Sequence, residues 1–245
     1  MSMEGATVFV TGGSRGIGKQ IALRFAELGA ARVAIGYLRN DSAAEETAEE
    51  LRGKGAEAVL VRGNISSDRV ATEVAGLGPL RALVHNAATG VIRPALETED
   101  KHWDWTHSAN ARALLSLARA AAPQMPNGAS IVGISSLGST RVLEDYVLVG
   151  TSKAALEALV RYLAVELAPR GIRVNAVSAG VIDTEALDYF PNKERMLTAG
   201  RKRTPAGRLV EPGDVADAVA FLCSPQAAMV CGHVLVVDGG YSLPA

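Results

Sequence analysis

Short apolar runs alternate with longer amphipathic segments along the chain. Seven runs of four to six residues are rich in β-branched and other aliphatic side chains, which is typical of strands. These runs are Ala6–Thr11, Arg32–Tyr37, Ala58–Arg62, Leu80–His85, Ser130–Ser135, Arg173–Ser178 and Val234–Val237.

Most of the segments between these runs have the period of a helix. One example is the set Leu156, Leu159, Val160, Leu163 and Leu167, whose spacing of three and four places it on one helix face. The alternation predicts an α/β fold, a single Rossmann-like doubly wound domain whose seven-stranded parallel sheet has helices on both faces. Ligands of such sheets bind beyond the carboxyl ends of the strands, so the residues after each strand are the candidate site.

The chain shows no sign of division into domains. No linker, repeat or low-complexity tract interrupts its 245 residues, so we predict one domain over 1–245. One long segment, about 183–212, lacks strand character and contains three prolines and several charges. We expect a substrate loop there that closes over the site, with apolar contacts from Ala186, Leu187 and Phe190.

Composition and charge exclude several function classes. The net charge of -1 gives no electrostatic reason to expect a nucleic-acid partner. No stretch approaches the roughly 18 apolar residues of a membrane span, so we expect no membrane partner. Cys223 and Cys231 form no Cys-x-x-Cys pair, and the four histidines share no metal-ligand spacing. We therefore predict a cytoplasmic protein without a catalytic metal.

A glycine-rich turn follows the first predicted strand. Gly12, Gly16 and Gly18 lie between Thr11 and the helical segment that begins near Lys19. Glycines let the backbone approach a pyrophosphate, which the first amides and the positive end of the next helix can bind. A glycine turn that binds nothing is the alternative, but the position after the first strand favours a phosphate site.

This glycine spacing resembles the short-chain dehydrogenase/reductase family, and further motifs match in order over essentially the whole chain. They are His85-Asn86-Ala87-Ala88, Asn110, Ser135-Ser136, Lys153, Asn175-Ala176-Val177 and Val237-Asp238-Gly239-Gly240. The resemblance implies a nicotinamide cofactor and a homotetramer built on long-helix contacts. Three positions depart from the family pattern, with His85 for the usual Asn, Ala88 for Gly and Ala179 for Pro.

The end of the second strand indicates which nicotinamide cofactor is used. An acidic residue there would bind an NAD ribose and repel a 2′-phosphate, but this turn reads Tyr37-Leu38-Arg39-Asn40. Arg15 and Arg39 can pair with a phosphate, which favours NADPH, unless both are solvated surface charges. The resemblance implies a cofactor site of Gly12, Ser14, Arg15, Gly16, Ile17, Gly18, Tyr37, Arg39, Asn64, Ile65, Asn86, Ala87, Lys153, Gly180, Ile182 and Thr184.

The expected catalytic acid is displaced. Most family members have a Tyr four residues before the active-site Lys, where this chain has Val149, and Tyr146 lies seven residues before Lys153. Seven helical steps of about 100° return to nearly the same face, about 4.5 Å farther along the axis than the usual position. Hydride addition to an enoyl thioester places charge on an oxygen remote from the attacked carbon. A displaced acid therefore suits that substrate better than a ketone.

The Tyr-x6-Lys spacing resembles members that reduce enoyl thioesters, above all the bacterial NADPH-dependent enoyl-acyl-carrier-protein reductases of the third type. That resemblance implies reduction of the trans-2 double bond of a thioester on acyl-carrier protein or coenzyme A, as in fatty-acid biosynthesis. Tyr146 would bind the thioester carbonyl, and Lys153 would bind the nicotinamide ribose. Ser136 and Asn110 complete the predicted catalytic set.

Two other functions stay open. A 3-oxoacyl-acyl-carrier-protein or other carbonyl reductase would use Tyr146 in a reshaped pocket. A catalytically silent NADP-binding scaffold or sensor would explain the missing Tyr at Val149. Tyr146 is then a surface tyrosine, Ser136 a serine at the core edge and Asn110 a satisfied buried amide.

Overall fold

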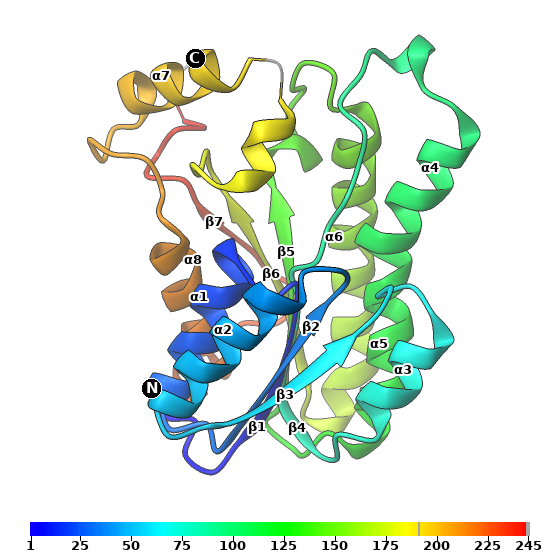
Figure 1. The fold of residues 1–245 in the computed structure, drawn as a ribbon, viewed down its shortest axis with the longest axis vertical. Coiled ribbons are helices and arrows are strands. Elements are labelled where there is room, and N and C mark those ends of the chain that lie inside the picture. Colours follow the sequence, from blue (N-terminus) through cyan, green and yellow to red (C-terminus); the bar gives the residue numbers. More distant parts are fainter. Residues whose placement is uncertain (191, 244–245) are drawn as a thin grey trace.

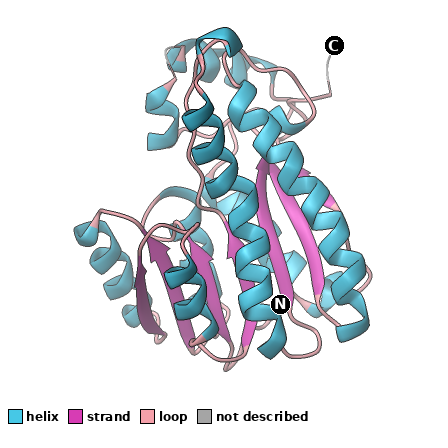
Figure 2. Cartoon of the chain, turned by 90° about the vertical axis from the view of Figure 1, so that its right-hand side faces the viewer, coloured by secondary structure: helices cyan, strands magenta, loops and turns pink. Residues whose placement is uncertain are grey.

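The computed structural model describes residues 1–190 and 192–243. Within these residues seven parallel strands form one sheet in the order β3-β2-β1-β4-β5-β6-β7. Figure 2 shows the strands side by side with helices packed against the sheet. The strands are β1 (Thr7–Thr11), β2 (Arg32–Tyr37), β3 (Glu57–Arg62), β4 (Leu80–His85), β5 (Ser130–Ser136), β6 (Arg173–Ala179) and β7 (Val234–Val237). Each predicted strand is present and ends within one residue of its predicted bounds.

Helices cover both faces of the sheet (Figure 1). One face carries α1 (Gly16–Glu27), α2 (Asp41–Gly53) and α8 (Pro212–Cys223), and the other carries α3 (Asp68–Ala75), α5 (Ala113–Ala121) and α6 (Val147–Leu167). Helix α4 (Asp100–His107) packs against α6 and continues through a π-helical turn, Ser108–Arg112, into α5. The predicted fold class is confirmed.

Aliphatic side chains fill the core on each side of the sheet. Ile21 of α1 and Val219 of α8 belong to one cluster, and Leu114 of α5 and Leu156 of α6 belong to the other. The strands between them are buried on both faces, which explains why their sequences are continuous apolar runs without alternation. The helical face predicted around Leu156 is the one that packs on the sheet.

The strand order creates a crevice at the carboxyl edge of the sheet. After β1 the chain builds outward through β2 and β3, then returns to place β4 on the other side of β1. Loops after β1 and β4 therefore diverge, and ligands of open α/β sheets bind at such a switch point. The glycine-rich turn follows β1, so the fold puts it at this crevice.

The segment predicted as a substrate loop is helical over much of its length. It contains a short 3-10 helix, η6 (Glu185–Tyr189), and α7 (Lys193–Arg203), which lies above the carboxyl ends of the strands in Figure 1. Leu197 and Gly200 are the buried residues of α7. The sequence of α7 carries too few large apolar residues to show a helical stripe, so the pattern predicted a loop. The side chain of Ala186 lies outside the described part of the chain.

None of the helices in the described residues is long and apolar enough to cross a membrane.

Candidate active site

The glycine-rich turn is shaped by backbone conformations and close contacts that require glycine. Gly12 and Gly16 have φ angles of 65° and 53°, in the left-handed region. A Cβ atom on Gly18 would overlap the carbonyl oxygen of Gly12. The turn thus packs directly on the first residues of α1, whose free amides point toward the crevice. This arrangement fits a pyrophosphate.

Residues after β4 hold this turn from the other side of the crevice. Thr11 Oγ1 accepts hydrogen bonds from the amides of Asn86 and Ala87, at 2.9 and 2.8 Å. The side-chain amide of Asn86 donates to the carbonyls of Thr11 and Gly12, at 3.0 and 3.2 Å. Predicted cofactor residues from two distant parts of the sequence, Gly12 with Asn86 and Ala87, therefore lie together.

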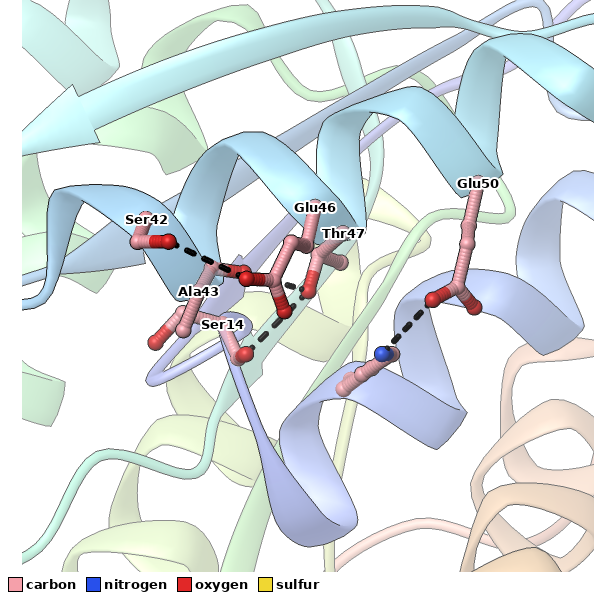
Figure 3. Close-up of polar contacts among 7 residues, drawn as sticks. Ser14, Ser42, Ala43, Glu46, Thr47 and Glu50 are labelled. Atoms are coloured by element: carbon pink, nitrogen blue, oxygen red, sulfur yellow. Dashed lines mark hydrogen bonds and ion pairs between the residues drawn. The ribbon is translucent and has the colours of Figure 1, made fainter.

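Helix α2 anchors the middle of the turn (Figure 3). Thr47 Oγ1 donates to the carbonyl of Ser14 at 3.1 Å, while Lys19 of α1 pairs with Glu50 of α2 at 2.8 Å. The side chain of Asn40 caps the first turn of α2 by accepting from the amide of Ala43 at 3.0 Å. The position of Ser14 is therefore fixed by contacts outside the turn.

The two predicted phosphate-binding arginines differ in their surroundings. Arg39 is exposed in the turn after β2. Arg15 lies at the start of α1, and its guanidinium pairs with the carboxylate of Glu185 in η6. The Thr184 methyl lies 4.0 Å from the position of a Cβ on Gly16. The segment predicted to close over the site thus contacts the phosphate turn.

Other predicted cofactor residues are spread along the same carboxyl edge. Tyr37 ends β2, and Asn64 follows β3 with its side-chain oxygen accepting from the amide of Ser66. Beyond β6 the amide of Gly180 donates to the carbonyl of Val237 at 2.9 Å. Ile17 and Ile65 pack against the two core clusters, and Ile182 is buried.

Tyr146 and Ser136 meet at the reacting end. Tyr146 precedes the first residue of α6, Val147, so it lies at the helix start and the helical arithmetic holds only approximately. Its hydroxyl donates to Ser136 Oγ at 3.4 Å, and its ring lies 5.8 Å from that of Phe190. Burial raises the pKa of Tyr146, while the Ser136 hydrogen bond opposes that rise. Tyr146 is therefore a protonated donor near neutral pH.

Val149 occupies the position where most family members have the acid. Its side chain is buried and packs against Gly90, where an added Cβ would overlap a Val149 methyl group. The Thr106 methyl lies on the same side of Gly90. At this position the chain therefore has an apolar contact between Val149 of α6 and Gly90, which follows β4, and no acidic hydroxyl.

Lys153 is buried beneath the site. Its ammonium Nζ donates to the carbonyl of Ile134 in β5 at 2.7 Å. Burial lowers the pKa of Lys153 to about 8, and the charge of Glu157 partly opposes this effect. Tyr146 and Lys153 thus make their polar contacts with different residues of β5, Ser136 and Ile134.

Asn110 lies in the π-helical turn between α4 and α5, a distortion that is frequent at functional sites. Its side-chain amide donates to the carbonyl of Thr89 at 2.8 Å and to Ser152 Oγ at 2.9 Å. Its side-chain oxygen accepts from the amide of Thr89 at 2.8 Å. The side chain of Asn110 thus links Thr89, after β4, to Ser152 of α6. A role of Asn110 in catalysis stays a prediction.

His85 is a buried polar residue to which the sequence assigned no role. Its Nδ1 lies 3.3 Å from Thr11 Oγ1, and its Nε2 lies 3.2 Å from the carbonyl oxygen of Asn110. Two backbone amides already donate to Thr11 Oγ1, so that hydroxyl donates its proton to Nδ1 and the proton of His85 is on Nε2. Burial, with the nearby charge of Lys153, lowers the pKa of His85 to about 4. The only sequence signal is its replacement of the usual Asn.

Within the described residues, no group of three or more His, Cys, Asp or Glu side chains could hold a metal ion.

Comparison with known proteins places this arrangement in a family. Residues 12–242 match the family described as enoyl-(acyl carrier protein) reductase. The 1-cyclohexenylcarbonyl-CoA reductase of Streptomyces collinus is 38% identical, over 96% of this chain and 86% of that protein. The chain belongs to the short-chain dehydrogenase/reductase family.

Members of this family with other substrates are also similar to it. The galactitol 2-dehydrogenase (L-tagatose-forming) of Cereibacter sphaeroides is 34% identical, over 98% of this chain and 96% of that protein. The structure of a short-chain dehydrogenase from Burkholderia cenocepacia in complex with NADP is 32% identical. It has a TM-score of 0.91, over 98% of this chain and 99% of that one. The protein is thus an oxidoreductase of the short-chain dehydrogenase/reductase family, and its substrate is a separate question.

Proposed function

We propose that this protein is an NADPH-dependent reductase of the trans-2 double bond of enoyl thioesters. One observation carries the proposal. Tyr146 is a partly buried hydroxyl donor at the start of α6, while Val149, one turn into the helix, makes an apolar contact with Gly90. The proton donor is therefore displaced toward the helix start, as reduction of a conjugated thioester requires.

The chemistry follows from where charge develops. When bound, NADPH would supply the hydride that the β-carbon takes up. Negative charge then develops on the thioester oxygen, and a fixed donor aimed at that oxygen lowers the barrier. Tyr146 is that donor, and its hydrogen bond to Ser136 fixes the direction of its hydroxyl. The α-carbon would then take a proton from Tyr146 or from solvent to complete the reduction. Lys153 holds the ribose hydroxyls of the cofactor and adds positive charge below the site.

NADPH fits the phosphate end of the site. Glycines bring the backbone close to the crevice, and the first turn of α1 presents free amides for the pyrophosphate. Arg15 and Arg39 supply positive charge for the 2′-phosphate. The NADP bound to the Burkholderia cenocepacia relative supports the same cofactor.

Two acyl carriers fit this proposal. The matching family description names acyl-carrier protein, and the Streptomyces collinus relative is named for a coenzyme A thioester. In that thioester the ring double bond is conjugated with the carbonyl, which is the chemistry proposed for this site. A straight-chain substrate on acyl-carrier protein would place the enzyme in fatty-acid biosynthesis.

The decisive experiment compares two thioesters. Purified protein is mixed with NADPH or NADH and either crotonyl-CoA or acetoacetyl-CoA, and the loss of nicotinamide absorbance is followed. We expect oxidation of NADPH with crotonyl-CoA and little with acetoacetyl-CoA. The same pair on acyl-carrier protein then identifies the preferred carrier.

Faster turnover of acetoacetyl-CoA than of crotonyl-CoA would show that the protein is a carbonyl reductase instead. Turnover with neither thioester, together with NADPH binding seen by fluorescence, would favour the silent scaffold.

We also propose a homotetramer, because the family resemblance implies one and the chain exposes large apolar side chains. Trp103 and Trp105 of α4 are 47% and 52% exposed, and Tyr162 and Val165 of α6 are exposed beyond 70%. Contacts between copies of the chain would cover such side chains. Light scattering after size-exclusion chromatography measures the mass, and a monomer would contradict this assembly.

A further inference from the structure

Helix α6 carries a buried carboxylate that the proposed chemistry does not use. Glu157 lies four residues after Lys153, so both side chains are on the same helix face. Their exposed fractions are only 7% and 5%. A buried glutamate is rare unless a partner compensates its charge. Glu157 shares its helix face with Lys153, the one buried lysine among the described residues, so we ask what the pair does.

Three consecutive residues of β5 connect this carboxylate to the reacting end. The carbonyl of Ile134 accepts from Lys153 Nζ, and the hydroxyl of Ser135 donates to the Glu157 carboxylate. The next residue, Ser136, accepts from the hydroxyl of Tyr146. Lys153, Glu157 and Tyr146 thus each form a hydrogen bond with one of three consecutive residues of β5. A displacement of one of these side chains would therefore alter the strand segment that the other two contact.

The charges around Lys153 come from few elements. Glu157 faces it from α6 itself and favours the ammonium form. His85 faces it from β4 and is neutral near pH 7. Among the described residues nearby, Tyr146 is the third titratable group. The group of β5 that accepts from Lys153 is the uncharged carbonyl of Ile134. Glu157 is therefore the carboxylate placed to act on the charge of the lysine, from the same helix face and without a direct ion pair.

We propose that Glu157 is a positioning residue that keeps Lys153 in its charged form and holds the Ser135–Ser136 end of β5 against α6. This inference rests on the proposed role of Lys153 at the cofactor ribose. An ammonium group has three protons to donate; one goes to the carbonyl of Ile134, and two would be available for the ribose hydroxyls. If Lys153 lost its charge at neutral pH, its hydrogen bonds to Ile134 and to the ribose would weaken. Its electrostatic stabilisation of the developing oxyanion would also be lost.

The test is the titration of Lys153 itself. The chain has six lysines, so protein with isotope-labelled lysine gives few Cε resonances, and Lys153→Met identifies the one that matters. We expect Glu157→Gln to move the titration midpoint of Lys153 down by about one pH unit, since an opposite charge nearby has an effect of that size. NADPH affinity, measured by fluorescence, should then begin to fall at a correspondingly lower pH.

Two variants control this measurement. Glu166→Gln removes an exposed carboxylate from the same helix and should leave the midpoint unchanged. Glu157→Asp keeps the charge but moves it away by one methylene, so its midpoint should lie between those of the parent and Glu157→Gln. If Glu157→Gln does not fold, the downward shift in Glu157→Asp is the test.

An unmoved Lys153 midpoint in the folded variant would overturn the inference, whatever happens to turnover. The proposed function fails by a different result, the absence of crotonyl thioester reduction in the parent protein, and that result leaves the lysine titration readable. The two failures are therefore distinguishable.

Discussion

The phosphate end and the reacting end of the site are built by different means. At the phosphate end, Gly12, Gly16 and Gly18 shape a backbone turn within one short stretch of sequence. At the reacting end, side chains from α6, β4, β5 and a π-helical turn meet in a buried cluster. A backbone site depends on local conformation, whereas a side-chain site depends on the packing of distant elements. Substitutions should therefore affect the two ends differently.

The largest effect is expected from the hydroxyl of Tyr146. Tyr146→Phe keeps the ring that packs near Phe190 but removes the donor to the thioester oxygen. We expect turnover of crotonyl thioester to fall about 100- to 1,000-fold, as loss of one oxyanion donor does. NADPH affinity should be unchanged, because the phosphate end is intact. Initial rates and fluorescence titration measure the two effects.

Tyr162→Phe is the matched control, since Tyr162 lies in α6 beyond the site residues and is 71% exposed in the single chain. It should keep full turnover. Equal turnover rates for Tyr146→Phe and the parent protein would show that Tyr146 has no part in the mechanism. The proposed difference between the two ends of the site would then be wrong as well.

A second effect at the reacting end concerns acid stability. The pKa of buried His85 is about 4, against an ordinary value of 6.5. Between these values the unfolded chain binds a proton that the folded chain does not, so stability is full above about pH 6.5 and falls as the pH drops toward 4. The total loss is roughly 3 kcal/mol. His85→Asn should show a smaller loss than the parent in urea unfolding at about pH 7 and pH 4.5.

His233→Asn is the control for this measurement, because His233 is exposed. Its dependence of stability on pH should match that of the parent. If His85→Asn also matches the parent, the acid sensitivity arises from carboxylates elsewhere, and the buried cluster has no part in it.

The same contrast explains what the sequence could predict. The strands and the glycine turn depend on local patterns, and the structure has them where the patterns indicate. Spacing and the family resemblance put Tyr146 and Ser136 in one candidate site, but their hydrogen bond is seen only in the structure. By contrast, nothing local links His85 to Asn110 or Ser135 to Glu157, because these pairs meet only after the sheet and α6 have packed. Helix α7 was missed because so little of it is apolar.

A steric change should disturb the phosphate end alone. The Cβ of Gly18→Ala would overlap the carbonyl oxygen of Gly12 and push the turn away from α1. Forced overpacking costs about 1–3 kcal/mol, and if that cost falls on the bound conformation of the turn, NADPH affinity should drop roughly 5- to 150-fold. Fluorescence titration measures this, with Gly53→Ala as the control, because a Cβ at that position of α2 contacts nothing. If Gly18→Ala binds NADPH as tightly as the parent protein does, the glycine-rich turn does not contribute to cofactor binding.

The smallest effect is expected where η6 contacts the phosphate end, at the exposed pair of Arg15 and Glu185. These side chains are 54% and 65% exposed, and such pairs contribute about 0.2–1 kcal/mol. If Arg15 binds the 2′-phosphate of NADPH, Glu185 competes with that phosphate for the guanidinium. Glu185→Gln should then tighten NADPH binding up to about fivefold. NADH, which lacks the phosphate, should bind as before.

Added salt should reduce this difference, because exposed charges are screened. Glu194→Gln removes an exposed carboxylate from α7 and is the matched control. An equal change for both cofactors would mean that Glu185 acts by holding the segment over the site, without competing for Arg15. In that case Arg39 becomes the main contact to the phosphate, and Arg39→Gln should lower the preference for NADPH more than Arg15→Gln does.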